Sequence, residues 1–152
     1  MANTNWEDLT AGKDCPFCAP RGDRNEFSVL VKKLAVSTLY LDRTQTYRGY
    51  CALIYSKRHV TGLEHLTDAE YAEFMDDLRR AMKAIAAAVE PDQMNYASLG
   101  NSIPHLHYHI IPRYKTDPRW RVNPFGEAPK VTFDTEAEYD ALADKIRAGL
   151  GG

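Results

Sequence analysis

Three of the five histidines lie within one short segment, His105-Leu-His107-Tyr-His109-Ile-Ile111. Alternate residues of a strand share a face, so the segment predicts a strand with three imidazoles in a row and apolar side chains behind them. Burying such a row in a core would require partners for every ring nitrogen. A neutral imidazole nitrogen can instead attack phosphorus, and a ring N–H can stabilise the charge on phosphoryl oxygens. The row therefore indicates phosphoryl-transfer or metal chemistry.

A close cysteine pair, Cys15-Pro-Phe-Cys18, has the spacing of two thiolates that share one metal ion. Half of a zinc site, a redox-active pair and two unligated thiols are the open interpretations. Redox pairs lie between a strand and a helix, whereas Pro20-Arg-Gly-Asp after this pair is typical of a loop, so zinc is favoured. Cys51 lies in an apolar run and is expected to be a small buried side chain.

The histidine row resembles the signature of the histidine-triad (HIT) superfamily, in which three histidines alternate with apolar residues. Two other segments extend the resemblance. Leu53 to Val60, which contains Lys-Arg-His59, is similar to the strand that precedes the main helix of the family. Cys15 to Cys18 is similar to the zinc half-site of many bacterial members, so the resemblance runs from Cys15 to Arg113. It implies an α+β, HIT-like fold.

The resemblance also implies a role for each histidine of the row. His107, the middle one, would be the nucleophile that forms a nucleotidyl-histidine, and a backbone carbonyl would fix its tautomer. His109 would lie near the α-phosphate and the leaving-group oxygen. Zinc-bearing members complete the metal site with two histidines, which here gives a closed structural Zn²⁺ site formed by Cys15, Cys18, His59 and His105.

Four further residues are candidate contacts to substrate. Ser102 matches a hydroxyl residue of the family, and Asn101 stands where many members have glutamine. Asn95 and Asp42 lie near positions that contact phosphate and a ribose hydroxyl in the family. The alternative for Asn95, Asn101 and Asp42 is the ordinary polarity of turns.

The elements that must position these residues follow from the apolar patterns. Strands are predicted over 36–42, 50–55, 94–99 and 105–111, with loops at 43–49 and 100–104. Capping boxes at Thr67–Glu70 and Thr135–Glu138 begin two helices, whose apolar stripes run to Val89 and Leu150. This order predicts an α+β fold with a small antiparallel sheet, one main helix and a C-terminal helix over 135–150.

The whole chain, 1–152, is expected to form a single HIT-like domain. Residues 114–130 are rich in proline and are expected to be irregular. Four basic residues surround Trp120 there: Arg113, Lys115, Arg119 and Arg121. This basic cluster is either a solvated surface, as charge runs usually are, or a site that binds extra phosphates or stacks a base.

Composition excludes several classes of protein. With 44% hydrophobic and 26% charged residues, the chain is typical of globular proteins, not disordered ones. A net charge of −2 argues against binding to a nucleic-acid polymer. There is no apolar run long enough to cross a membrane, and the N-terminal stretch lacks the features of a signal peptide, so a cytoplasmic location is expected.

The sequence therefore favours a nucleotide hydrolase or nucleotidyl transferase that acts at the α-phosphorus of nucleoside-5′-phosphoryl substrates. Purine nucleotides or their conjugates are the expected ligands, diadenosine polyphosphates among them, and the resemblance implies a homodimer. Two alternatives remain open: a nucleotide-binding regulatory module with little turnover, and a zinc-dependent interaction or redox protein.

Overall fold

The computed structural model describes residues 5–151, so both ends of the expected domain, 1–152, and the first residues of the N-terminal stretch expected to lack signal-peptide features lie outside the described residues. Five strands form one antiparallel sheet in the order β1-β2-β3-β5-β4. The strands are β1 (Ser28–Lys33), β2 (Ser37–Asp42), β3 (Cys51–Tyr55), β4 (Gln93–Ala97) and β5 (His107–Arg113). The helices are α1 (Trp6–Thr10), the short 3₁₀ helix η1 (Leu63–His65), α2 (Asp68–Val89) and α3 (Glu136–Gly149). The predicted α+β class is confirmed.

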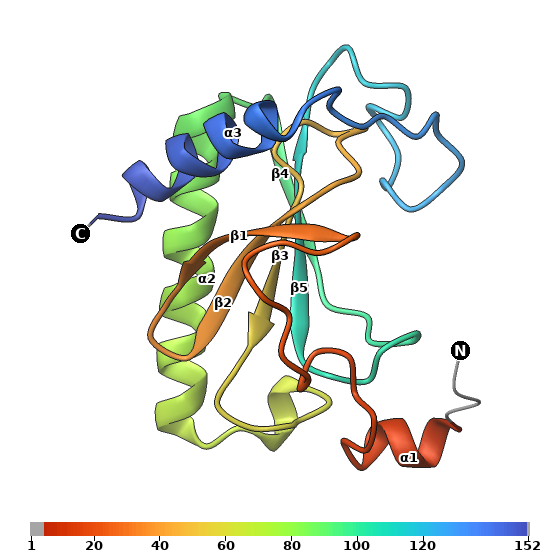
Figure 1. Cartoon of the computed structure of the whole chain (residues 1–152), viewed down its shortest axis with the longest axis vertical. Coiled ribbons are helices and arrows are strands. Elements are labelled where there is room, and N and C mark those ends of the chain that lie inside the picture. Colours follow the sequence, from red (N-terminus) through yellow and green to blue (C-terminus); the bar gives the residue numbers. More distant parts are fainter. Residues whose placement is uncertain (1–4, 152) are drawn as a thin grey trace.

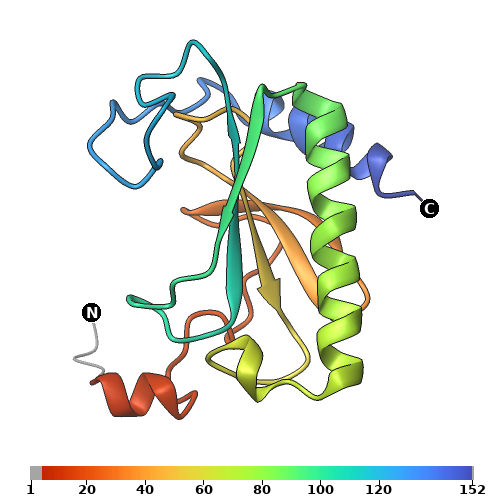
Figure 2. The same cartoon turned by 180° about the vertical axis from the view of Figure 1, so that it is seen from behind.

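Helices α2 and α3 cover one face of the sheet, and the N-terminal segment and the chain between β5 and α3 lie on the other side (Figures 1 and 2). The core fills the space between the helices and the sheet, with Leu53, Phe74 and Ile110 fully buried within it. Cys51 is also buried there, as predicted. The open face of the sheet is thereby left for polar side chains.

Both predicted helices begin at the predicted capping boxes. The Thr67 side chain accepts a hydrogen bond from the Glu70 backbone, and Thr135 does the same with Glu138. Helix α2 ends where Glu90 adopts a left-handed backbone, with φ at 49°, just before Pro91. Within residues 5–151, none of the helices combines the length and apolar character needed to span a membrane.

Apart from starts one residue later for β2 and β3, the strand bounds differ from the prediction in three places. Strand β1 was missed, and β4 spans Gln93–Ala97, not 94–99. Strand β5 begins at His107, not at residue 105, and continues to Arg113. The reason is that the Leu106 N–H donates to the Val60 carbonyl, beyond the end of β3, so the residues paired with β3 begin at His107.

Candidate active site and metal centre

The two later histidines of the row lie on the open face of the sheet. Leu106, Tyr108 and Ile110 pack on the core side, so His107 and His109 point to the opposite face, as the alternation predicts. The ring centroids of His107 and His109 are 5.0 Å apart. Across the sheet, His107 pairs with Ile54 of β3 and His109 pairs with Ala97 of β4, so both imidazoles stand on a strand flanked by β3 and the edge strand β4.

His107 is held in one tautomer by the backbone. Its Nδ1 lies 2.6 Å from the His105 carbonyl oxygen, which can only accept, so Nδ1 carries the proton and Nε2 keeps its lone pair. Burial lowers the pKa of His107, which keeps the ring neutral at pH 7. The Phe17 ring packs edge-on against it at 4.9 Å. The result is an unprotonated ring nitrogen in a mostly dry setting.

His109 has a hydrogen-bond partner that the sequence did not reveal. The Tyr50 hydroxyl lies 2.6 Å from His109 Nδ1 and has no other hydrogen-bond partner within residues 5–151. Burial, and then the charge of Asp42, raise the pKa of Tyr50, so the phenol keeps its proton. We therefore assign the phenol as donor, which leaves His109 with its proton on Nε2. Burial and the neighbouring His107 lower the pKa of His109 to about 4, so this ring is also neutral.

The four predicted metal ligands come together from three parts of the chain. One donor atom from each of Cys15, Cys18, His59 and His105 lies within 4.8 Å of the others. His105 Nδ1 is 3.5 Å from both cysteine sulfurs, and His59 Nδ1 is 3.4 Å from Cys18 Sγ. Zinc bonds of about 2.3 Å to sulfur and about 2.1 Å to nitrogen at tetrahedral angles would place such atoms about 3.6 Å apart. These three separations therefore match those of a tetrahedral zinc site.

Both histidines of this cluster are prepared for a metal by their second nitrogens. His105 Nε2 donates to the Tyr55 carbonyl at 2.6 Å, and His59 Nε2 donates to the Thr10 carbonyl at 3.0 Å. Each Nδ1 therefore presents its lone pair to the thiols, the arrangement typical of metal-binding histidines. A Cβ at Gly12, whose φ is +85°, would lie 3.0 Å from the His59 ring, so glycine lets this turn pack closely over His59.

The cysteine pair lacks the electrostatics of a redox motif. Desolvation, and then the hydrogen bond and charge of Cys15, raise the pKa of the Cys18 thiol to about 11. Redox-active pairs need the opposite, a thiolate whose pKa is lowered by nearby positive charge. A bound cation would supply that charge and deprotonate both thiols, so the surroundings favour the metal interpretation over the redox one.

The candidate substrate contacts are more dispersed. Asn101 and Ser102 are exposed on the loop between β4 and β5. Asp42, at the end of β2, accepts a hydrogen bond from the Thr44 N–H at 2.7 Å and lines a cavity of about 500 Å³. Burial raises the pKa of Asp42, and the Thr44 hydrogen bond opposes that shift. Asn95 points to the open face, where its Oδ1 accepts from Arg113 Nη1 at 2.8 Å.

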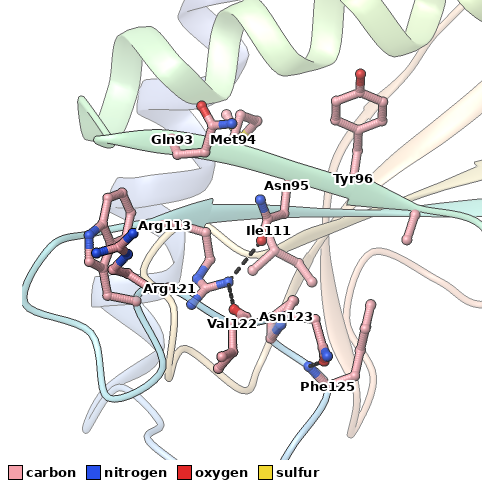
Figure 3. Close-up of a pocket in the computed structure, with 13 residues that line it drawn as sticks. Gln93, Met94, Asn95, Tyr96, Ile111, Arg113, Arg121, Val122, Asn123 and Phe125 are labelled. Atoms are coloured by element: carbon pink, nitrogen blue, oxygen red, sulfur yellow. Dashed lines mark hydrogen bonds between the residues drawn. The ribbon is translucent and has the colours of Figure 1, made fainter.

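The basic cluster around Trp120 is not a uniform solvated surface, because Arg113 is only 2% exposed. Its guanidinium pairs with Asp117 at 2.8 Å and donates to Asn95 and to the Val122 carbonyl (Figure 3). These bonds fasten the segment 114–125 to the sheet and leave a cavity of about 740 Å³ between them. Sequence reasoning missed this role because it depends on how the chain after β5 folds back, which brings Asp117 and Val122 to the Arg113 guanidinium, and on the pairing of β5 with β4, which brings Asn95.

Comparison with known proteins gives consistent matches. The HIT domain family model matches residues 24–116. An adenosine 5′-monophosphoramidase of Schizosaccharomyces pombe is 31% identical over 107 residues, which cover 65% of this chain and 74% of that protein. A bis(5′-adenosyl)-triphosphatase of Saccharomyces cerevisiae is 33% identical over 72 residues, which cover 44% of this chain and 35% of that protein.

Solved structures show the same fold. A histidine triad protein from Bradyrhizobium japonicum aligns with a TM-score of 0.78 and 22% identity, covering 89% of this chain and 99% of that one. A zinc-bound histidine triad family protein from Mycobacterium smegmatis aligns with a TM-score of 0.63 and 22% identity, covering 90% of this chain and 93% of that one.

Proposed function

This chain belongs to the HIT domain family, and from that premise we propose that it is a nucleotide hydrolase or nucleotidyl transferase acting at the α-phosphorus of nucleoside-5′-phosphoryl substrates. The observation that carries the proposal is the His107 tautomer, because the bond from Nδ1 to the His105 carbonyl leaves Nε2 free to attack. Relatives named as a monophosphoramidase and a bis-adenosyl-triphosphatase support the same substrate class.

The proposed reaction has two displacements. His107 Nε2 attacks the α-phosphorus, a nitrogen–phosphorus bond forms, and the bond to the leaving group breaks with its electron pair on that group. The phosphorylated ring is then cationic and still donates Nδ1–H to the His105 carbonyl. Water, or another acceptor, attacks phosphorus in the second step, loses its proton to solvent and returns His107 to its neutral form. Hydrolysis releases the nucleoside 5′-monophosphate.

His109 is proposed to stabilise the charge that develops on the leaving group. With Tyr50 donating to Nδ1, the proton on Nε2 can hydrogen-bond a phosphoryl or leaving-group oxygen. Asp42, whose backbone N–H donates to the Tyr50 carbonyl, is proposed to hold the ribose. Asn101 and Ser102 would complete the phosphate contacts from the loop before β5, and the amide nitrogen of Asn95 would do so from β4.

Replacing Tyr50 with phenylalanine is expected to reduce kcat by roughly tenfold, the worth of one hydrogen bond that fixes a tautomer. The Tyr50 hydrogen bond keeps the His109 proton on Nε2, where it stabilises the leaving group. The loss of kcat is therefore expected to be larger for a poor leaving group, an amine or an alcohol, than for nitrophenolate, and kinetics with one substrate of each kind measure this difference. Tyr71→Phe is the matched control, since Tyr71 is an exposed residue of α2. An equal loss on both substrates would mean that Tyr50 is merely structural.

The metal cluster is proposed to hold one structural Zn²⁺ through Cys15, Cys18, His59 and His105. Four protein ligands leave no open position, so the ion would supply rigidity and not a reactive water. His105 connects the metal cluster to the proposed nucleophile. Its ring belongs to the metal cluster, and its carbonyl oxygen accepts the hydrogen bond that fixes the tautomer of His107. The zinc named in the Mycobacterium smegmatis structure supports this proposal.

A panel of adenylylated and guanylylated substrates, with product masses, tests the proposed function. Release of a nucleoside 5′-monophosphate is the expected result. Tight nucleotide binding without measurable turnover of any substrate would favour the regulatory module. Failure to bind any nucleotide, with zinc present, would favour the interaction protein.

A further inference from the structure

A cavity on the open face lies beside the histidines, and the proposed reaction assigns no part of the leaving group to it. It has a volume of about 740 Å³, within the range of small-molecule sites. Its walls are β4, the end of β5 and the segment 120–125 (Figure 3). Arg113 forms part of the wall, but its donors are occupied by Asp117, Asn95 and backbone carbonyls, so it shapes the cavity and is not free to bind a ligand.

The cavity adjoins His109 directly. Phe125 lines it and packs edge-on against the His109 ring, with the ring centroids 5.6 Å apart. Ala97 and Asn95 of β4 line the cavity and pair with His109 and Ile111 of β5, so the lining begins at the strand position opposite His109. A group bonded to a phosphorus atom held at His107 and His109 can therefore extend into this space.

The layout of the sheet assigns a direction to each half of a substrate. Asp42 lies on β2, on the β3 side of β5, whereas the cavity lies at β4, on the other side of β5. With the nucleoside half on the Asp42 side, the β4 side is the remaining direction across the sheet for the leaving group. In-line displacement adds that the leaving group departs on the far side of phosphorus from His107.

The lining fits a group that is both aromatic and anionic. Trp120 offers a half-buried indole face, and Arg121 brings an exposed guanidinium to the same wall. Asn95 and Asn123 add amides. Indole faces stack on heteroaromatic rings, and guanidinium groups pair with phosphate. A leaving group as small as ammonia would leave these side chains without a contact.

We propose that this cavity is a leaving-group subsite, formed by the chain's own 120–125 segment, that binds a ring carrying a phosphate. A nucleoside phosphate and an aryl phosphate share that chemistry. The proposal rests on the proposed function, since it assigns the second half of the same substrate. In this proposal, Trp120 and Arg121 determine the specificity for the leaving group and take no part in bond breaking.

The test compares two substrates that differ in the leaving group, adenosine 5′-phosphoramidate and diadenosine triphosphate. Trp120→Ala is expected to lower kcat/KM for the triphosphate by roughly tenfold, as the loss of one stacking contact does. The value for the phosphoramidate should stay unchanged. Trp6→Ala is the matched control, because Trp6 is an exposed tryptophan on α1, at the opposite end of the molecule (Figure 1). An equal effect on both substrates, or on neither, would overturn the subsite.

Two further measurements identify which leaving group the cavity binds and distinguish a failure of the subsite from a failure of the proposed function. The first uses an adenylylated phenyl phosphate. If Trp120→Ala lowers kcat/KM for this substrate as much as for the triphosphate, a ring with a phosphate is enough for recognition, whereas a decrease for the triphosphate alone identifies a nucleoside. If the wild type cleaves none of these substrates, the proposed function fails, and the cavity is tested by binding alone. Trp6→Phe leaves Trp120 as the sole tryptophan, and its fluorescence should be quenched by added ADP. No quenching at millimolar ADP would overturn the subsite.

Discussion

Replacing His107 with asparagine is expected to lower kcat by roughly five to six orders of magnitude, as the loss of a catalytic nucleophile does. The physical reason is that the neighbouring ring cannot replace it as a nucleophile, because His109 presents an N–H on its Nε2. Asparagine keeps a similar size and can still donate to the His105 carbonyl. Nucleotide affinity should therefore change little, and the loss should lie in kcat.

The measurement is single-turnover kinetics together with equilibrium binding of a nucleoside 5′-monophosphate. An unchanged melting temperature and zinc content would show that the variant retains its fold. His107→Asn protein that turns over substrate at the wild-type rate would remove His107 from the nucleophile's role.

The second large effect is expected at the metal cluster. Cys15→Ser should lose the zinc, because serine does not replace a thiolate ligand. A free metal concentration about a thousand times the dissociation constant adds about 4 kcal/mol to the free energy of unfolding. For a chain of this size, that corresponds to roughly 8–16 °C in Tm. Elemental analysis and thermal unfolding measure both quantities. A chelator should lower the Tm of the wild type by a similar amount and leave the variant unchanged.

Variants of the histidine row separate the metal role from the chemical one. His105→Ala should lose zinc and stability, with activity falling as a consequence, because its ring faces Cys15 and Cys18. His109→Ala should keep both and lose roughly 2–4 kcal/mol of transition-state stabilisation. Cys51→Ala is the thiol control, since Cys51 lies in the core. Zinc loss in the His109 variant and not in the His105 variant would reverse the two assignments.

Local patterns in the sequence predicted most of what positions the site. The alternation from His105 to Ile111 placed His107 and His109 on the open face, and the capping threonines Thr67 and Thr135 marked both long helices. The cysteine spacing indicated half of the metal cluster. The other half came from the family resemblance, and in the structure His59 and His105 do lie beside the cysteines.

Contacts between distant segments could not be predicted from local patterns. Tyr50 and His109 are 59 positions apart, and nothing in the sequence near either residue indicates the bond between them. The charge of Arg113 is visible in the local sequence, next to its basic neighbours, whereas its burial depends on Asn95 and on the fold of the chain after β5. Strand β1 was missed because it ends in Lys32 and Lys33, so it lacks a continuous apolar run.

The stereochemical course at phosphorus tests the central claim most directly. The substrate carries a chiral α-phosphorothioate, hydrolysis takes place in water enriched in heavy oxygen, and the configuration of the product is determined by phosphorus NMR. Each in-line displacement inverts the phosphorus centre. Attack by His107 followed by attack of water on the nucleotidyl-histidine predicts net retention. Net inversion would mean a single direct attack by water and would contradict the covalent mechanism.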